Sequence, residues 1–162
     1  MAACRRRVTS ANVIPGVTSK RVFSEHRLRR RVQFYETDAA GIVHFSWYFR
    51  YMEEAEHALW REAGLSVAPP GSELHWVRVT ASCDFHGALY FEQEFEVWIR
   101  IVAMTRNTIR YASLIARGDT RIATGTHTVG CVLIRPNEPL RSTNCPPEIA
   151  ARFQIAPGAD GP

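Results

Sequence analysis

The sequence has few of the features that mark secreted or membrane-spanning proteins. Its 162 residues include four cysteines, none of them in a Cys-x-x-Cys pair, and no signal-peptide-like apolar segment precedes them. Unpaired cysteines of this kind are typical of a reducing compartment. No apolar run approaches the roughly 18 residues that a membrane-spanning helix needs. We therefore expect a cytoplasmic protein with no membrane span.

Motifs of several enzyme classes are also missing. The chain has no Gly-x-Ser-x-Gly nucleophile elbow and no P-loop. Its six histidines include no pair at i, i+4 spacing on a predicted helix. The single Cys-x-x-His pattern, from Cys83 to His86, has no second pair that would complete four metal ligands. We expect neither a metal site nor a cofactor.

Positive charge is scarce beyond the first 31 residues. Residues 1–31 hold nine basic groups and one acidic group, whereas residues 32–162 hold eleven basic and fifteen acidic groups. A nucleic-acid-binding domain spreads basic groups over a folded face, so we expect no nucleic acid as a partner. Residues 1–26, rich in Ser, Thr and Arg, are predicted to be a disordered basic leader. An Arg-rich organelle transit peptide is the alternative.

The remaining pattern predicts one helix among five strands. Ser46 is a suitable N-cap and Gly64 a suitable residue just past the C-terminus, so the helix is expected over 47–63. The short links between the last four strands exclude helical crossovers, and neighbouring strands should therefore pair antiparallel. Period-two alternation places the strands at 27–34, 75–85, 91–101, 107–117 and 121–135.

This β-α-β-β-β-β order predicts an α+β fold, in which a five-stranded antiparallel sheet packs its apolar face on one long helix. We expect a single domain over residues 27–153 and a flexible tail over 154–162. A chain of this length can bury a core that is stable without disulfides or metals.

A carboxylate stands between the first strand and the helix, in the run FYETDAAGIVHFSWYFRYMEEAEHALW that begins at Phe34. Asp38 ends the strand, Gly41 allows a tight turn, and a helix N-terminus, whose unpaired N–H groups attract negative charge, follows within about ten residues. In an ordinary turn the carboxylate would only cap backbone N–H groups. The alternative is a base beside an anion hole. Thioester hydrolysis needs little more, because the thiolate leaves without a general acid.

The run FYETDAAGIVHFSWYFRYMEEA resembles the signature of the hotdog-fold acyl-CoA thioesterases of the 4-hydroxybenzoyl-CoA thioesterase type. That signature is approximately Thr-Asp-x-x-Gly-[Ile/Val]-Val, followed by an aromatic pair and a long central helix. The later runs IATGTHTVGCVLI and CPPEIAARF resemble the family's last strand and C-terminal segment, so residues 27–153 are covered. The resemblance implies hydrolysis of an acyl-CoA to free acid and CoA. It also implies a homodimer or a tetramer of two dimers, with the site between subunits.

The resemblance implies roles for individual residues. Asp38 would act as a nucleophile, through a mixed anhydride, or as a general base on water. The backbone N–H of Phe45 would bind the thioester oxygen. Further positions expected at the substrate are Gly41, Val43, Trp47, Tyr48, Glu53 and Arg106.

Two of these positions have a plain alternative. Glu53 matches a helix acid that faces the acyl pocket in some relatives, and it is otherwise a solvated helix residue. Arg106 matches a position that meets the nucleotide end of coenzyme A in some relatives, and it is otherwise an exposed turn residue. The aromatic side chains of Phe45, Trp47 and Tyr48 predict an apolar acyl pocket.

The chain departs from the family pattern at two places. Many relatives have a Tyr-His pair where this chain has His44-Phe45, so His44 is expected to be either a second catalytic group or a packed pocket residue. The Glu-Ala-Arg motif of many relatives is Glu54-Ala55-Glu56 here, which removes a cation from the helix.

Two other functions are weighed against thioester hydrolysis. A catalytically silent hotdog module that binds acyl-CoA or an acyl group would share the fold, but an intact Asp38 favours the enzyme. Hotdog dehydratase chemistry pairs a histidine with an acid placed differently from Asp38, and it is the least favoured of the three.

Overall fold

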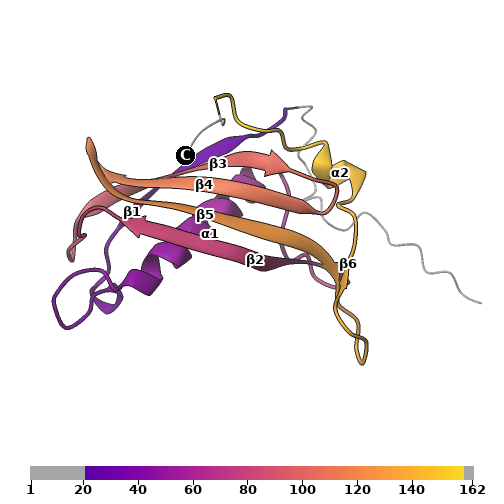
Figure 1. Cartoon of the computed structure of the whole chain (residues 1–162), viewed down its shortest axis with the longest axis horizontal. Helices are drawn as coiled ribbons and strands as arrows, with labels where there is room; N and C mark the ends of the chain where they lie inside the picture. The colour runs from indigo at the N-terminus through magenta and orange to yellow at the C-terminus, as the bar shows by residue number, and fades with distance from the viewer. Residues whose placement is uncertain (1–20, 159–162) are drawn as a thin grey trace, which may run out of the picture.

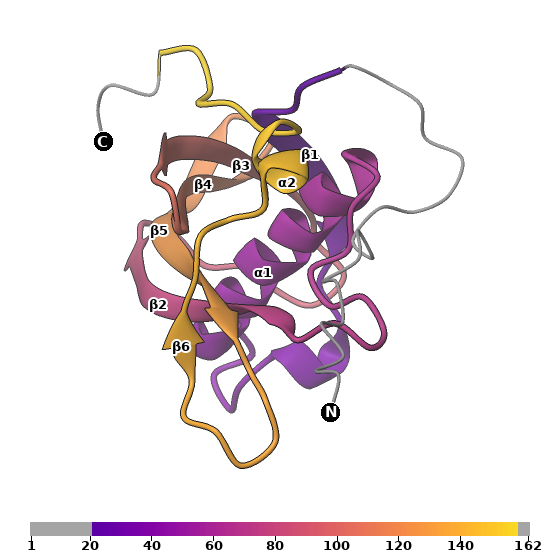
Figure 2. The ribbon, with the colours of Figure 1, turned by 90° about the vertical axis from the view of Figure 1, so that its right-hand side faces the viewer.

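The computed structural model describes residues 21–158, in which an antiparallel sheet curves around one long helix (Figures 1 and 2). The strand order is β1-β3-β4-β5-β2, and the short β6 pairs with β5. The predicted hotdog-type α+β fold is confirmed, with β6 as a sixth strand. No helix in this part of the chain is long and apolar enough to span a membrane. The elements are β1 (Glu25–Arg31), a 3₁₀ helix (Phe34–Glu36), α1 (Phe45–Glu62), β2 (Leu74–Phe85), β3 (Glu94–Met104), β4 (Thr108–Arg117), β5 (Thr120–Leu133), β6 (Arg141–Ser142) and α2 (Pro147–Ala150).

Helix α1 begins two residues earlier than predicted. Its N-cap is His44, whose Nδ1 accepts the N–H of Ser46 at 3.4 Å and lies 2.8 Å from the Ser46 hydroxyl oxygen. The prediction of Ser46 as the cap is wrong, because an imidazole nitrogen takes the place of the commoner hydroxyl acceptor. Phe45 is therefore the first helical residue. At the other end, the predicted Gly64 follows the helix with a φ of +72°, the left-handed conformation that ends many helices.

Two strands are displaced from their predicted ranges. β1 ends at Arg31 and not at the predicted Phe34, which lies in the 3₁₀ helix and is 76% exposed. β3 starts at Glu94, three residues later than expected, because Glu92 has a φ of +67° and its N–H donates to the Val32 carbonyl at 3.1 Å. Alternating hydrophobicity shows which residues share a face but not where the ladder begins.

The folded domain extends beyond the expected limits of 27 and 153. Phe23 is buried, its N–H donates to the Arg152 carbonyl at 2.9 Å, and its carbonyl accepts the N–H of Gln154 at 3.0 Å. Ala156 is also buried and donates its N–H to the Ile101 carbonyl at 2.8 Å. Residues 21–26 and 154–156 thus belong to the packed domain. The rest of the expected leader, residues 1–20, lies outside the described residues.

The core lies between α1 and the concave face of the sheet (Figure 2). Helix and sheet come very close at Gly125 of β5. A Cβ added there would lie 2.5 Å from the sulfur of Met52 on α1 and 2.8 Å from the Ser82 carbonyl oxygen on β2. The missing side chain is what lets the helix approach the sheet. The fully buried side chains of the core include Tyr51, Met52, Ala55, Leu59, Ile99, Ile101, Ile109 and Tyr111.

Candidate active site

Asp38 lies in a tight loop between the 3₁₀ helix and α1. Its N–H donates to the Ile42 carbonyl at 2.8 Å, and its carbonyl accepts the N–H of Gly41 at 2.9 Å. Gly41 has a φ of +76°, which only glycine adopts without strain. One carboxylate oxygen, Oδ1, accepts the N–H of Ala40 at 2.8 Å. Within residues 21–158 no other hydrogen bond to this carboxylate is found, so its second oxygen is available for chemistry.

Backbone contacts on both sides hold this loop against the segment between β2 and β3 and against the 3₁₀ helix. The N–H of the buried Val43 donates to the Leu89 carbonyl at 2.8 Å, and Ile42 forms an isolated β-bridge with Tyr90. On the other side, the N–H of His44 donates to the Glu36 carbonyl at 2.9 Å. The loop that carries Asp38 is consequently fixed before α1 begins.

A buried carboxylate two residues before Asp38 strengthens this attachment. Glu36 accepts Arg30 Nη2 at 2.6 Å, the Tyr51 hydroxyl at 2.8 Å and the backbone N–H of Gln33 at 2.8 Å. Arg30 also pairs with Glu54 on α1. We call Glu36, Arg30 and Tyr51 the Glu36 cluster. Burial and the neighbouring Glu36 carboxylate raise the pKa of Tyr51, so its hydroxyl stays a proton donor.

Sequence reasoning missed the Glu36 cluster because its members are separated along the chain. Glu36 and Tyr51 are 15 residues apart, and Arg30 belongs to a strand that looks solvated from its basic composition. The available signal was weak: a glutamate directly after two aromatic residues and close to a candidate catalytic acid.

The N-terminus of α1 presents an unpaired N–H group. Ser46 donates its N–H to His44 Nδ1, and Trp47 donates its N–H to the His44 carbonyl at 3.0 Å. In the described part of the chain, the Phe45 N–H has no acceptor. His44 thus caps the helix, a role that its two expected alternatives did not include. The N–H of Phe45 is a free donor at the positive end of the helix dipole.

Aromatic side chains surround the loop and the helix N-terminus. The ring centroids of Phe34 and Phe91 are 5.8 Å apart, and those of Tyr35 and Trp47 are 5.5 Å apart. Tyr48, in contrast, is buried, and burial raises its pKa. A concentration of exposed apolar surface like this one is typical of binding sites and interfaces. The exposed aromatic residues of this region are Phe34, Tyr35, Phe45, Phe85, Tyr90 and Phe91.

A cavity of about 300 Å³ opens along the side of α1, and Glu53 lines it together with Phe49, Met52, Arg78 and His127. The Glu53 carboxylate lies 2.9 Å from Arg50 Nη1 and 3.6 Å from Arg78 Nη2. Glu53 thus lines a cavity, and its carboxylate lies beside two arginines.

A second buried carboxylate lies beside this cavity. Glu56, only 1% exposed, accepts Arg78 Nη1 at 2.8 Å and lies 3.0 Å from Nε2 of His127, which is 2% exposed. Burial opposes the charge of Glu56, but His127 and Arg78 outweigh it, so its pKa is lowered. We call these three residues the Glu56 cluster. The cation paired with Glu56 is thus Arg78 of β2.

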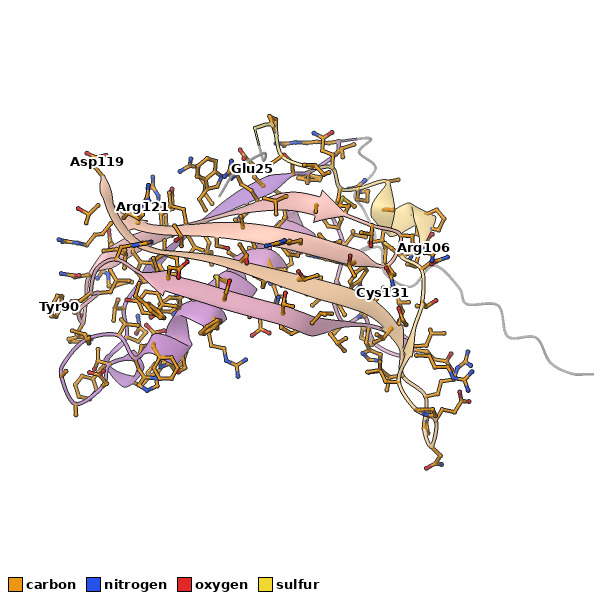
Figure 3. All side chains as sticks on the ribbon, in the orientation of Figure 1. Glu25, Tyr90, Arg106, Asp119, Arg121 and Cys131 are labelled. Carbon is orange, nitrogen blue, oxygen red and sulfur yellow. The ribbon has the colours of Figure 1, made fainter. Side chains whose placement is uncertain are left out.

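Arg106 does not join the other site residues within one chain. It follows the end of β3, whereas Tyr90, which pairs with the Asp38 loop, precedes the start of that strand. Figure 3 shows Arg106 and Tyr90 at opposite ends of the sheet. The 11 residues of β3 separate them by about 35 Å.

The donor set offers no metal site. No group of three His, Cys, Asp or Glu side chains within residues 21–158 is arranged to hold a metal ion. What the site combines is a partly free carboxylate, an unpaired helix N–H and apolar walls.

An antiparallel sheet wrapped around a central helix, with a carboxylate loop at the helix N-terminus, defines a hotdog domain of the thioesterase type. A family model described as the thioesterase superfamily matches residues 40–124, and the chain belongs to this superfamily. A curated relative from Aquifex aeolicus (strain VF5), named "Putative esterase", is 38% identical over 59% of this chain and 75% of its own length.

Solved structures show the same fold. A hypothetical protein from Aquifex aeolicus has a TM-score of 0.69 at 32% identity, over 80% of this chain and 99% of its own. A 1,4-dihydroxy-2-naphthoyl-CoA thioesterase from Synechocystis has a TM-score of 0.72 at 18% identity, over 79% of this chain and 94% of its own. A 4-hydroxybenzoyl-CoA thioesterase variant in complex with 4-hydroxybenzoyl-CoA has a TM-score of 0.70 at 17% identity, over 80% and 99%.

Proposed function

We propose that this protein hydrolyses an acyl-CoA thioester to the free acid and CoA. The observation that carries the proposal is the pairing of two groups at one helix end: the Asp38 carboxylate, with one oxygen free, and the unpaired N–H of Phe45. Membership of the thioesterase superfamily and the named activities of the structural neighbours support the substrate class.

Asp38 starts the reaction in one of two ways. As a nucleophile, its free oxygen attacks the thioester carbonyl carbon, the C–S bond breaks, the CoA thiolate leaves, and water then hydrolyses the mixed anhydride. As a general base, it takes a proton from the water that attacks the same carbon. In both cases the Phe45 N–H donates to the developing oxyanion, a contribution of about 3 to 4 kcal/mol for a well-placed donor.

The walls of the site would bind the acyl group. Trp47 and the exposed aromatic residues offer apolar contact near the thioester, while Gly41, Val43 and Tyr48 shape the loop and the helix start. Glu53 lines the cavity further along α1. Arg106 can reach a CoA nucleotide at this site only from a second subunit.

A homodimer, or a tetramer of two dimers, would provide that second subunit. β2 is an edge strand, and its residues Val79 and Phe85 are exposed. An exposed apolar edge of this length favours pairing with another copy. Analytical ultracentrifugation at micromolar concentration, combined with activity measurements, tests this: we expect the active species to be at least a dimer, and an active monomer would exclude a shared site.

A binding module that lacks turnover is the second candidate function. It is favoured by one observation, the hydrogen bond from the Ala40 N–H to Asp38 Oδ1, because this contact is also what a turn-capping aspartate makes. Under this alternative, acyl-CoA binds at the aromatic surface and is not hydrolysed.

Turnover of an acyl-CoA panel by the wild-type protein separates the two candidates, because the binding module releases no CoA. The substitution Asp38→Asn then tests whether Asp38 is catalytic. It keeps the size and most of the hydrogen bonding of the side chain but removes the charge, so we expect kcat with an acyl-CoA panel to fall by about 10²-fold or more, while Tm stays the same. Asp119→Asn, in the exposed β4–β5 turn, is the matched control and should change neither quantity. Unchanged kcat together with a Tm lowered by several degrees would identify Asp38 as a turn cap.

A further inference from the structure

The face of the sheet that points away from α1 carries a hollow of its own. Directly paired residues of an antiparallel sheet point to the same side, and one row of them crosses β3, β4, β5 and β2: Trp98, Leu114, Thr124 and Asp84. The next residue along β3, Ile99, is buried in the core, so this row faces away from α1 (Figure 1). A cavity of about 780 Å³ lies over the row, and we call it the outer groove.

Positive charge dominates the outer groove. Arg100, Arg110 and Arg121 line it, and within residues 21–158 none of the three pairs with a carboxylate. The arginines of β1, in contrast, all pair with glutamates. Asp84 is the one acidic residue among those that line the groove. The groove therefore keeps a net positive charge that an anionic partner can neutralise.

The three arginines lie toward opposite ends of the outer groove. Arg100 pairs with Ala112 of β4, and Arg110 is two residues away on that strand, whereas Arg121 pairs with Ala116. Figure 3 shows Arg121 at one end of the sheet. At about 3.4 Å per residue and 4.8 Å between strands, the first two Cα atoms lie roughly 15 to 20 Å from that of Arg121. One phosphate group cannot reach both ends, so the spacing fits an extended ligand with separate negative charges.

The floor between these ends has the composition of a protein interface. Ala112 and Leu114 form an apolar centre on β4. At its side, the Trp98 ring has the guanidinium carbon of Arg27 at 4.2 Å and that of Arg100 at 4.6 Å from its centroid. Tryptophan and arginine are enriched among the residues that dominate binding between proteins. Because two guanidinium groups already contact this ring, it offers a poor stacking platform for a nucleotide base.

The dimensions and charge of the outer groove also restrict its occupant. Four strands span about 14 Å, which accommodates an α-helix of about 10 to 12 Å diameter. A second copy of the same face is disfavoured, because two grooves of net positive charge would repel each other.

We propose that the outer groove docks an acidic helix of a partner protein. Carboxylates about 15 to 20 Å apart on this helix would pair with Arg121 at one end and with Arg100 and Arg110 at the other. Because the groove faces away from α1, the docked helix leaves the N-terminus of α1 open. The inference is therefore independent of the proposed function.

The test uses fluorescence anisotropy with labelled, alanine-based helical peptides. The spaced peptide has two pairs of glutamates 12 residues apart, which is about 18 Å along a helix. The clustered peptide has the same four glutamates side by side, and the neutral peptide has glutamines instead. We expect the spaced peptide to bind the full-length protein about tenfold more tightly than the clustered one, with an affinity that falls as salt is added. The neutral peptide should not bind.

Charge reversal at either end of the groove tests the arginines. Arg110→Glu and Arg121→Glu should each weaken binding of the spaced peptide about tenfold. Both side chains are exposed, so Tm should not change. Arg61→Glu is the matched control, because it makes the same change in net charge at an exposed position of α1, on the other layer of the molecule. It should keep the wild-type affinity.

Equal affinity for the spaced and clustered peptides, or an equal loss in Arg61→Glu, would overturn the proposal, because either result indicates general charge attraction. Tighter binding of an oligouridine RNA or of inorganic pyrophosphate through Arg110 would overturn it in favour of a nucleic-acid or phosphate site. A smaller oligomer of Arg110→Glu in analytical ultracentrifugation would show that a second copy occupies the groove, and it would overturn the proposal as well.

Discussion

The Glu36 and Glu56 clusters both bury a carboxylate against an arginine and a ring, but they differ in what is left unpaired. Glu36 receives hydrogen bonds from Arg30, Tyr51 and the Gln33 backbone. Glu56 accepts a hydrogen bond from Arg78 and pairs with Nε2 of His127. Among the described residues, Nδ1 of His127 has no partner, and the ring lines a cavity.

The difference separates a saturated network from an incomplete one. A saturated buried network holds elements in place, as the Glu36 cluster holds the Asp38 loop to β1 and α1. In the Glu56 cluster, one ring nitrogen of His127 has no partner among the described residues. If this distinction is correct, replacing the carboxylate of the first cluster should lower the free energy of unfolding more than replacing that of the second.

The largest effect is expected from Glu36→Ala. Removing one member of a buried ion pair and its hydrogen bonds should lower the free energy of unfolding by about 3 to 5 kcal/mol, measured by urea denaturation. Turnover should fall as well, because the Asp38 loop loses its attachment. Glu94→Ala removes an exposed partner of Arg31 on the same sheet and should leave the unfolding midpoint unchanged. Equal effects of the two substitutions would contradict the structural role of Glu36.

Glu56→Gln should lower the free energy of unfolding at neutral pH by less than Glu36→Ala does, about 1 to 3 kcal/mol, because the amide keeps one acceptor. The pKa of Glu56 is lowered by folding, so its ionised form stabilises the protein above the pKa of about 4.5 of an unperturbed glutamate. That contribution is lost as the pH falls through the lower pKa that Glu56 has in the folded protein. The difference in the free energy of unfolding between wild type and variant should therefore be constant near neutral pH and shrink below about pH 4.5. Urea denaturation across this range checks it, and a gap that widens in acid would contradict the assignment.

Tyr51→Phe should lower the stability by about 2 kcal/mol, since the lost hydroxyl donates to a charged acceptor. Tyr48→Phe is a useful comparison, because Tyr48 bonds the neutral backbone of Leu89 and should cost only about 1 kcal/mol. Thermal denaturation of both variants measures the difference. A ranking in the opposite order would mean that the Glu36 cluster is looser than its geometry indicates.

Gly41→Ala should have the smallest effect on stability, about 1 kcal/mol, because nothing lies within 4 Å of the added methyl group and only the positive φ opposes it. Gly71→Ala, at a φ of +75° in open space, should cost the same. We expect kcat to fall only in the Gly41 variant, since that turn positions Asp38. Equal loss of activity in both would show that the turn is not specific to the site.

The parts of this molecule that were predictable are those encoded by neighbouring residues. Alternation along 107–117 and 121–135, joined by a short turn, is enough to predict the antiparallel β4–β5 pair. Asp38, Gly41 and Phe45 lie within one short stretch, so their proximity follows from a tight turn and a helix start in succession, although a 3₁₀ helix and not the predicted strand precedes the turn.

What could not be predicted depends on contacts between distant residues. His127 and Glu56 are 71 positions apart, and nothing local in either segment indicates the pair. The helix start was misplaced because a histidine and a serine two positions apart are both able to cap, and only the fold decides between them. The role expected of Arg106 requires a second subunit, and the position of that subunit cannot be derived from contacts within one chain.

The close approach of α1 to the sheet at Gly125 has a consequence for how this protein can diversify. A methyl group there would collide with Met52, which also lines the cavity beside His127, and with a strand carbonyl that cannot move freely. The width of the cavity is therefore linked to the spacing of the two layers. Residues such as Phe49 and Ala81 can vary to reshape the cavity. A larger residue at Gly125, in contrast, would change the cavity only by disrupting the core.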